Sequence, residues 1–266
     1  MDFNEPSLQK RLSGRKIGHT VHYFEAVDST NDIAFKLAHQ GASEGTVVVA
    51  DFQRSGKGRL SRSWQSPPGT NIYTSIILRP AISPVIAPQM TLMAGVAVAD
   101  AITLYCPGRV TLKWPNDVQV GHKKVCGILA EMKTSDQGVD FVILGIGLNV
   151  NIRLDELDPA FRNVATSLGE EAGIILSRLQ VMEDLVDAIE RCYPLFIREG
   201  FALIRRQWLR HCDMVGKPLQ VVFKEDIQTG KMLGIDEDGS LLLEDGQNNV
   251  RRVTAGDASI MKDSEK

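Results

Sequence analysis

The pattern of the sequence changes near residue 212, and this change limits the folds that the chain can adopt. Before it, short β-branched segments alternate with longer segments whose apolar residues recur at helical spacing. After Cys212 the chain has only short strand-like segments, namely LQVVFK, GKMLGID, GSLLLED and NVRRVTA, separated by turn residues such as Asp238 and Gly239. We therefore predict an α/β domain over residues 1–212 and a small barrel-like β domain over residues 213–266.

Within the first domain, the expected elements follow from apolar spacing and from Gly and Pro boundaries. We expect helices over 31–40 and 84–106, and a helical region over 177–211 in two segments, of which the first ends at Gly200 and is kinked or broken at Pro194. Strands are expected over 46–53, 71–80, 109–120, 123–133 and 140–152, with a hairpin turn at Gly121-His122.

Charge and composition exclude several classes of protein. The 266 residues carry a formal net charge of −3, and the isoelectric point near 6.0 argues against a generic nucleic-acid binder, so we expect no DNA binding. The N-terminus lacks the apolar run of a secretory signal, and no apolar stretch approaches the ~20 residues of a membrane span. The four cysteines form no CxxC pair, which suits reduced thiols in the cytoplasm better than disulfides or zinc.

Residues 51–65, DFQRSGKGRLSRSWQ, gather four cations on a glycine-containing loop: Arg54, Lys57, Arg59 and Arg62. The loop matches neither GxxxxGK[ST] nor GxGxxG, because Ser61 occupies the third glycine position of the latter. Two glycines still let backbone N–H groups approach an anion, and arginine offers a bidentate fork to phosphate or carboxylate. A bound anion and a merely solvated basic loop both fit the sequence at this point.

Three further segments carry polar residues inside apolar runs. KWPND (113–117) places a proline where a central strand would not tolerate it. HKKVCGILAE (122–131) has two lysines, of which alternation turns one toward a cleft. GIGLNVN (145–151) ends with Asn149 and Asn151, which are either ligand contacts or hydrogen-bonded core amides.

The segment DSTND (28–32) has two interpretations as well. Ser29 and Asp32 have the spacing of a capping box at a helix N-terminus. The same N-terminus is a suitable place for the polar head of a ligand.

Taken in order, DSTN, the basic loop, KWPND, KKVCGIL and GIGLNVN resemble the biotin–protein ligase family over residues 22 to 260. The resemblance implies a mixed-sheet catalytic domain similar to class II aminoacyl-tRNA synthetases, followed by an SH3-like barrel. It implies two steps: biotin reacts with ATP to give biotinoyl-AMP, and the biotinoyl group then passes to a lysine of a biotin carboxyl carrier protein, usually that of acetyl-CoA carboxylase. Only about twenty residues precede the motifs, so we expect a form without the N-terminal DNA-binding domain.

The resemblance also assigns roles to residues. It implies that Lys124, Arg59 and Asp117 act at the reacting centre, with Mg²⁺ carried by the ATP phosphates and Asp117 as its candidate protein contact. The biotin contacts that it implies are Ser29, Thr30, Asn31, Gln53, Lys57, Gly58, Arg59, Lys124 and Gly127. The nucleotide contacts that it implies are Arg59, Arg62, Trp64, Asn116 and Asn149. Trp64 and Trp114 fit equally well as aromatic residues of the core.

The loop departs from the family pattern GRGRxGR at two positions. Lys57 keeps the charge but loses the bidentate fork of arginine. Ser61 removes the backbone freedom of a glycine. Both bear on how tightly the loop retains the adenylate.

Two other functions share parts of this pattern. A lipoate or octanoate ligase or transferase has the same catalytic fold, although it lacks the pairing of KWPND with K-x-x-G-I-L. A biotin-responsive regulator would use the basic loop on DNA, which the absence of a helix-turn-helix disfavours. A homodimer is compatible with the sequence, which does not decide the oligomeric state.

Overall fold

The computed structural model describes residues 3–261, which form two β-sheets and six α-helices. The larger sheet has the strand order β1-β2-β3-β7-β6-β5-β4. Only β1 and β2 pair in parallel, so the sheet is mixed, as expected. Its strands are β1 (Val21–Val27), β2 (Val47–Gln53), β3 (Ile72–Leu78), β4 (Val110–Lys113), β5 (Asp117–Val120), β6 (Lys123–Ser135) and β7 (Gly138–Leu148).

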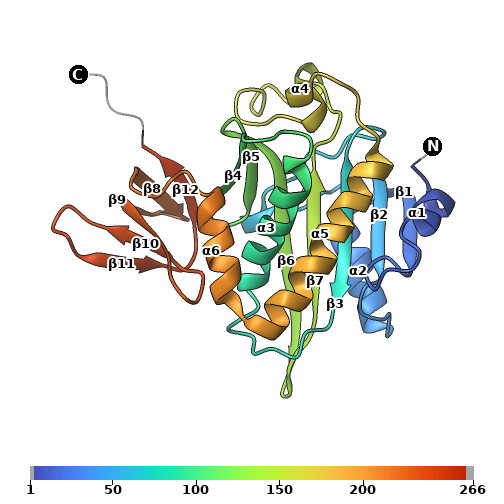
Figure 1. Ribbon diagram of the computed structural model, residues 1–266, viewed down its shortest axis with the longest axis horizontal. Coiled ribbons are helices and arrows are strands. Elements are labelled where there is room, and N and C mark those ends of the chain that lie inside the picture. Colours follow the sequence, from blue (N-terminus) through green and yellow to red (C-terminus); the bar gives the residue numbers. More distant parts are fainter. Residues whose placement is uncertain (1–2, 262–266) are drawn as a thin grey trace.

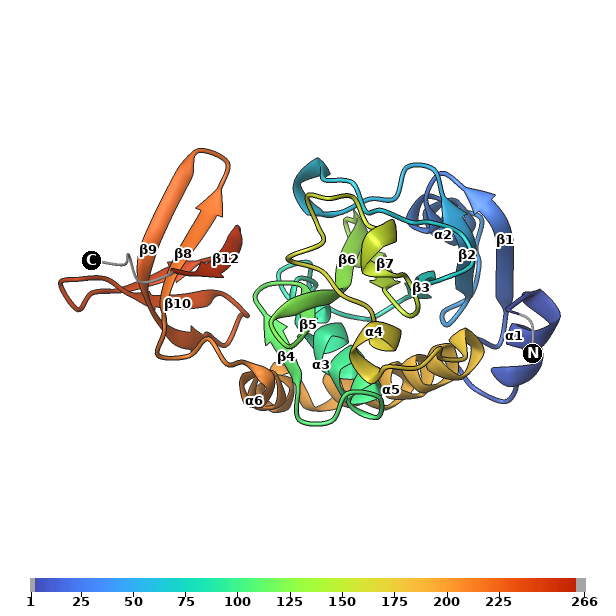
Figure 2. The ribbon, with the colours of Figure 1, turned by 90° about the horizontal axis from the view of Figure 1, so that it is seen from above.

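The helices lie on both faces of this sheet (Figures 1 and 2). They are α1 (Glu5–Arg11), α2 (Thr30–His39), α3 (Gln89–Thr103), α4 (Leu168–Ala172), α5 (Arg178–Glu199) and α6 (Phe201–His211), with 3₁₀ turns η1 (Arg59–Ser61) and η2 (Leu154–Glu156). None of the helices within residues 3–261 combines the length and the apolar character needed to cross a membrane.

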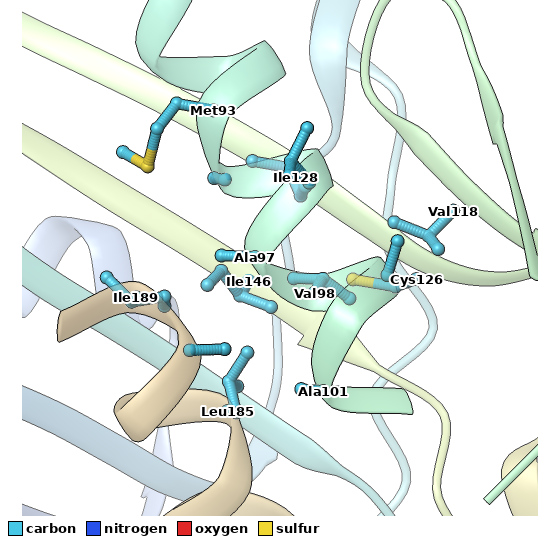
Figure 3. Packing of buried hydrophobic residues seen from close by; sticks show 14 of the residues in the cluster. Met93, Ala97, Val98, Ala101, Val118, Cys126, Ile128, Ile146, Leu185 and Ile189 are labelled. Atoms are coloured by element: carbon cyan, nitrogen blue, oxygen red, sulfur yellow. The ribbon is translucent and has the colours of Figure 1, made fainter. Parts of the chain in front are cut away.

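Alternation along the strands divides the apolar residues between the two faces. Val47 and Val49 belong to the main core, which α3 and α5 cover (Figure 3). Val48 instead joins a smaller cluster beneath α2 with Ile77 and Ile143. Short α2 covers only one end of its face, so the remainder of that face is free to form a site.

The residues after α6 form a separate antiparallel sheet of five strands, in the order β11-β10-β9-β8-β12 (Figure 1). The strands are β8 (Pro218–Phe223), β9 (Asp226–Ile235), β10 (Leu241–Glu244), β11 (Val250–Val253) and β12 (Asp257–Ile260). The sequence predicted the first four but not β12. Leu219 and Met232 of this sheet belong to the main apolar cluster, and Arg205 of α6 donates to the Ile235 carbonyl, so the two sheets pack through α6.

The prediction of one strand over 109–120 was wrong. The chain turns at Trp114-Pro115-Asn116, where the peptide bond before Pro115 is cis, and β4 and β5 pair as a hairpin. Proline has no N–H for a strand ladder, so the chain leaves the strand there. The next hairpin is where it was expected, and Gly121 and His122 both have the positive φ of a tight primed turn.

Two helices differ in part from the prediction. Helix α5 continues through Pro194 without a break, and it ends where the sequence divided the helical region, at Glu199 with Gly200 as its C-cap; the φ of 75° at Gly200 is easy only for glycine. Ten residues of α5 are buried, and this packing outweighs the hydrogen bond that the proline removes. Helix α3 starts at Gln89 rather than residue 84, because the residues before it form turns.

Leu185 of α5 tests how far this layer depends on packing. Its side chain is fully buried in the same apolar cluster as Ile146 and Ala101 (Figure 3). We expect Leu185→Ala to lower the free energy of unfolding by about 2–5 kcal/mol, because lost burial and a cavity add together. Urea denaturation measures this, with Leu104→Ala as control since Leu104 is exposed. An equal, small loss in both variants would contradict the packing described here.

Candidate active site

The free part of the α2 face is the floor of a cavity of about 620 Å³. The loop over residues 53–65 and the turn between β4 and β5 contribute its walls. All the site residues that the sequence predicted line this cavity, although they come from five separate segments: Ser29, Thr30, Asn31, Gln53, Lys57, Gly58, Arg59, Arg62, Trp64, Asn116, Asp117, Lys124, Gly127 and Asn149. Their shared location is thus a property of the fold, whereas their roles remain predictions.

Three glycines of β6 and β7 make the floor flat. A Cβ at Gly145 would lie 2.2 Å from Asn31 Oδ1, and one at Gly147 would lie 2.5 Å from Trp64 Nε1. At Gly127 a Cβ would lie 2.9 Å from the Trp64 ring. We predicted Gly127 as a place of close approach by a ligand, and in the structure the groups that approach it are Trp64 and Lys124. The glycines therefore make room for side chains as well as for a ligand.

Trp64 lies across this floor with its indole N–H unpaired. Its Nε1 is buried and has no hydrogen-bond partner among the described residues, and a buried donor without a partner costs about 1–3 kcal/mol. Lys124 Nζ lies 5.2 Å from the centre of the ring, within cation–π range. A ligand that offers an acceptor to Nε1, or that moves the ring, would remove this cost.

The KWPND turn binds two cationic side chains of the cavity, Arg59 and Lys124. Asn116 Oδ1 accepts a hydrogen bond from Arg59 Nη1 at 3.1 Å. The next residue, Asp117, forms a salt bridge with Lys124 Nζ at 2.7 Å. Adjacent residues of one turn thus bring a guanidinium from the basic loop and an ammonium from β6 into the same cavity.

A residue of the C-terminal sheet completes the surroundings of Arg59. Asp257 Oδ1 lies 3.4 Å from Arg59 Nη1, and its other oxygen pairs with Arg62. Burial lowers the pKa of the Arg59 guanidinium, while the carboxylates of Asp257 and Asp117 act in the opposite direction. The sequence analysis missed Asp257, because nothing in the local sequence signals a contact across about two hundred residues.

The other two cations of the loop pair with the acids at either end of DSTND. Lys57 forms a salt bridge with Asp32, and Arg54 lies 3.6 Å from Asp28. The capping-box interpretation was therefore wrong: Ser29 is the N-cap residue of α2, but its side chain makes no cap hydrogen bond. Four carboxylate contacts thus offset the repulsion among the loop cations, and an anionic ligand would share the arginines with Asp257.

The far end of the cavity has a buried polar network around Thr30. Gln53 Oε1 accepts a hydrogen bond from the Thr30 N–H at 2.9 Å and lies 3.1 Å from the Thr30 hydroxyl oxygen, and Gln53 Nε2 donates to Ser66. Ser75 of β3, which the sequence analysis missed, lies 2.8 Å from Thr30 Oγ1. Alternation along the strand places Ser75 on the same face of the sheet as Ile77, and this pattern could have predicted that Ser75 faces the cavity side.

The two asparagines of GIGLNVN are satisfied amides. Asn149 Nδ2 donates to the Thr166 carbonyl at 3.0 Å, and its Oδ1 accepts from Asn71. Asn151 exchanges two hydrogen bonds of 2.9 Å with the backbone of Leu176. Of the two, only Asn149 lines the cavity.

Trp114 belongs to the core rather than to the cavity. It is buried, and its Nε1 donates to the Gly239 carbonyl of the C-terminal sheet at 3.0 Å. Of the two tryptophans that the sequence singled out, Trp64 lines the cavity and Trp114 joins the two sheets.

A segment that the sequence analysis did not single out closes one side of the cavity. Leu157, Phe161 and Val164 line it, and the Lys124 N–H donates to the Val164 carbonyl at 2.8 Å. The side-chain amide of Gln65 donates to the Glu156 carbonyl and accepts from the Asp158 N–H, so this segment is tied to the basic loop. The segment has no periodic pattern, which explains why it was missed.

The loop adopts left-handed backbone at two residues that are not glycine. Leu60 has φ 55° and Ser61 has φ 59°. This conformation costs an L-residue roughly 1–2 kcal/mol. With Ser61 in place of the family glycine, the loop still adopts the left-handed backbone conformation. Glycine would avoid the energetic cost of that conformation.

The cavity offers little to bind a bare metal ion. Within residues 3–261 there is no group of three His, Cys, Asp or Glu side chains that could hold one. Asp117 and Asp257 are the carboxylates on its wall. A single carboxylate together with substrate phosphates is a common way to bind Mg²⁺, so Asp117 fits that limited role.

Comparison with known proteins identifies the family. Residues 23–149 match the model of the biotin/lipoate A/B protein ligase family, and residues 216–261 match the biotin protein ligase C-terminal domain. The bifunctional ligase/repressor BirA of Bacillus subtilis is 35% identical over 97% of this chain and 79% of its own length. The chain belongs to the biotin protein ligase family.

Other members of the biotin protein ligase family agree with this assignment. The biotin–[acetyl-CoA-carboxylase] ligase of Paracoccus denitrificans is 35% identical over 81% of this chain and 90% of its own. The biotin protein ligase of Aquifex aeolicus, solved with biotin and ATP, superposes with a TM-score of 0.78 at 30% identity, covering 91% of this chain and 99% of its own. The fold of this ligase-family chain, including its C-terminal sheet, is thus the fold of the family.

Gly147 allows a test of the floor. We expect Gly147→Ala to push the Trp64 ring off the sheet, shift its fluorescence and lower stability by about 1–3 kcal/mol, as overpacking does. Emission spectra against a Trp64→Phe background isolate the signal. Gly246→Ala is the control, because a Cβ there meets nothing within 4 Å. Unchanged Trp64 emission in Gly147→Ala would show that the ring does not rest on Gly147.

Proposed function

We propose that this protein activates biotin with ATP as biotinoyl-AMP and transfers the biotinoyl group to a lysine of a carrier protein. The observation that supports this most is the convergence of Arg59 and Lys124 on the adjacent residues Asn116 and Asp117. Joining a carboxylate to a phosphate brings two anions together, which needs cations fixed at the point of reaction. The Aquifex aeolicus relative, solved with biotin and ATP, supports the same pair of substrates.

In the first step, a carboxylate oxygen of biotin attacks the α-phosphorus of ATP, and the bond to pyrophosphate breaks. The ureido head would lie among Ser29, Thr30 and Gln53, where hydroxyl and amide groups line the cavity. Lys124 would meet the biotin carboxylate, and Arg59 the phosphoryl oxygens. Both then stabilise negative charge on the transferring group, and they need little reorganisation because Asn116 and Asp117 already hold them.

Remaining contacts follow from position in the cavity. Lys57 and Gly58, which line the cavity from the loop, would contact the biotin chain, and Arg62 and Trp64, which also line it, would contact the nucleotide. Asn31 and Asn149 have their amides bonded to protein partners, so we propose that they shape the walls.

In the second step, the neutral ε-amine of the carrier lysine attacks the acyl carbon, and the C–O bond breaks to release AMP. The amine must lose a proton to react. Asp257 is engaged by both Arg59 and Arg62, whereas Asp117 has Lys124 as its cationic partner. We therefore assign to Asp117 the orientation of the incoming amine.

Mg²⁺ would bind through the ATP phosphates with Asp117 as its protein contact. When bound, it supplies charge neutralisation at the phosphates.

The partner and the setting complete the proposal. The name of the Paracoccus denitrificans relative specifies acetyl-CoA carboxylase, so we propose its biotin carboxyl carrier protein as the partner. We propose a boundary between catalytic and C-terminal domains near residue 213, although the outer limits, residues 1 and 266, lie outside the described residues. A cytoplasmic location, the absence of DNA binding and a homodimer stay predictions.

Lys124→Ala tests the first step. We expect ATP–pyrophosphate exchange that depends on biotin to fall by a factor of about 10² or more, because a charge at the reacting carboxylate is lost. Lys123→Ala is the matched control: Lys123 is the neighbouring residue on β6 but does not line the cavity. Near-normal exchange in Lys124→Ala would remove Lys124 from the mechanism.

Arg59→Ala tests retention of the intermediate. Biotinoyl-AMP should dissociate faster by about tenfold or more, since a charged hydrogen bond contributes about 1.5–3 kcal/mol, while the binding of free biotin should weaken less. Arg54→Ala serves as control, because Arg54 pairs with Asp28 outside the cavity. Stopped-flow measurement of adenylate release decides, and equal release rates in both variants would refute the role of Arg59.

The overall function is tested by mass spectrometry of a carrier domain incubated with the protein, ATP, Mg²⁺ and biotin. We expect the mass of one biotinoyl group on one lysine. The same incubation with lipoate or octanoate addresses the other branch of the matched family, whose model covers both kinds of ligase. Modification by lipoate without modification by biotin would overturn the proposal.

A further inference from the structure

A buried chain of polar side chains leads from the head-group end of the cavity to a carboxylate outside it. Thr30, Asn31 and Ser75 are each at most 4% exposed. Ser75 Oγ lies 2.8 Å from Thr30 Oγ1 and 2.6 Å from Asn31 Oδ1, and Asn31 Nδ2 donates to Glu131 Oε2 at 2.6 Å. Glu131 does not line the site cavity; it lines a neighbouring open cleft of about 1000 Å³.

The chemistry of Glu131 determines how the amide of Asn31 is oriented. A carboxylate and a backbone carbonyl are acceptors only, and both Glu131 and the Leu129 carbonyl lie against the same amide atom, which must therefore be the nitrogen. The oxygen of Asn31 then faces Ser75. Gly145 allows this packing, because a Cβ there would lie 2.2 Å from that oxygen.

This orientation propagates along the chain, because each hydroxyl has one proton. Ser75 must donate its proton to Asn31 Oδ1, since that oxygen cannot donate. The 2.8 Å contact between Ser75 and Thr30 then requires the proton of Thr30. Gln53 Oε1 keeps the Thr30 N–H as its donor, and lies 3.1 Å from a Thr30 oxygen whose proton is used elsewhere.

The result is a pair of neighbouring oxygens with free lone pairs, Thr30 Oγ1 and Gln53 Oε1, on residues that line the cavity. Two such oxygens favour a ligand that places an N–H donor between them. The ureido ring of biotin has N–H groups of this kind, whereas the dithiolane of lipoate has none.

We propose that Glu131 is a specificity-determining residue: through Asn31 and Ser75 its carboxylate directs the hydrogen bonds so that the cavity presents acceptors to a urea N–H. The inference rests on the proposed function, since it takes biotin as the ligand. Glu131 is a positioning residue, as it acts through Asn31 and touches neither substrate. Within residues 3–261 no Lys or Arg forms a salt bridge with Glu131, which leaves its charge to act on the amide.

The test compares Glu131→Gln with the wild type. Glutamine has the same shape but can donate as well as accept, so the direction of the chain then depends on the Leu129 carbonyl alone, whose contact with Asn31 Nδ2 is the longer one at 3.4 Å. We expect KM for biotin to rise about tenfold, the size of one charge-assisted hydrogen bond, with kcat at saturating biotin unchanged because the reacting centre is untouched. The preference for biotin over lipoate in calorimetric titration should fall by the same factor. Glu225→Gln, on an exposed turn, is the matched control and should change neither.

A double-mutant cycle shows whether the effect passes through Ser75. In a Ser75→Ala background the chain is already interrupted, so adding Glu131→Gln should raise KM no further. Independent, multiplying effects of the two substitutions would overturn the inference, as would an unchanged KM in Glu131→Gln or a fall in kcat equal to the rise in KM. These outcomes leave the proposed function standing; wild-type protein that fails to bind biotin at all would refute the proposed function instead.

Discussion

The site depends on a stretch of sheet without side chains. Gly127, Gly145 and Gly147 lie on one face of β6 and β7, and at each of them a Cβ would collide with another side chain. Because the floor is bare backbone, Trp64 can lie flat on it, Asn31 can reach the strand beyond, and Lys124 can turn over the ring. Any larger residue would lift these groups and separate the cations from the polar head-group end.

Charge in this cavity is balanced before any ligand arrives. The four cationic side chains of the basic loop would repel one another, but Asp28, Asp32 and Asp257 each pair with one or two of them. Two of these acids flank the segment that lines the head-group end, and the third comes from the C-terminal sheet. An anionic ligand therefore competes with carboxylates for the loop, which couples the position of the loop, and of the C-terminal sheet, to occupancy of the site.

Local pattern predicted the elements well wherever packing agreed with propensity. The strands at 46–53 and 71–80 and the tight turn at Gly121-His122 are where we expected them. Prediction from the local sequence failed where a contact between residues distant in the sequence outweighed a local preference. Pro194 stays inside α5 because the helix is buried along its length. Ser29 is the N-cap residue of α2, but no capping box forms, because Asp32 pairs with Lys57 and the Thr30 N–H bonds to Gln53.

By itself, the sequence determined which residue types were available and in which order: a cationic glycine loop, a proline that forces a turn, and glycines at alternate strand positions. These are local properties, set by backbone freedom and side-chain charge. Only the tertiary structure decided that Arg59 meets Asn116 and Asp257, that Trp64 rests on Gly147, and that Glu131 lies behind Asn31. Such contacts join residues up to about two hundred positions apart, and their partners depend on how the strands of the sheet are ordered, which no local pattern specifies.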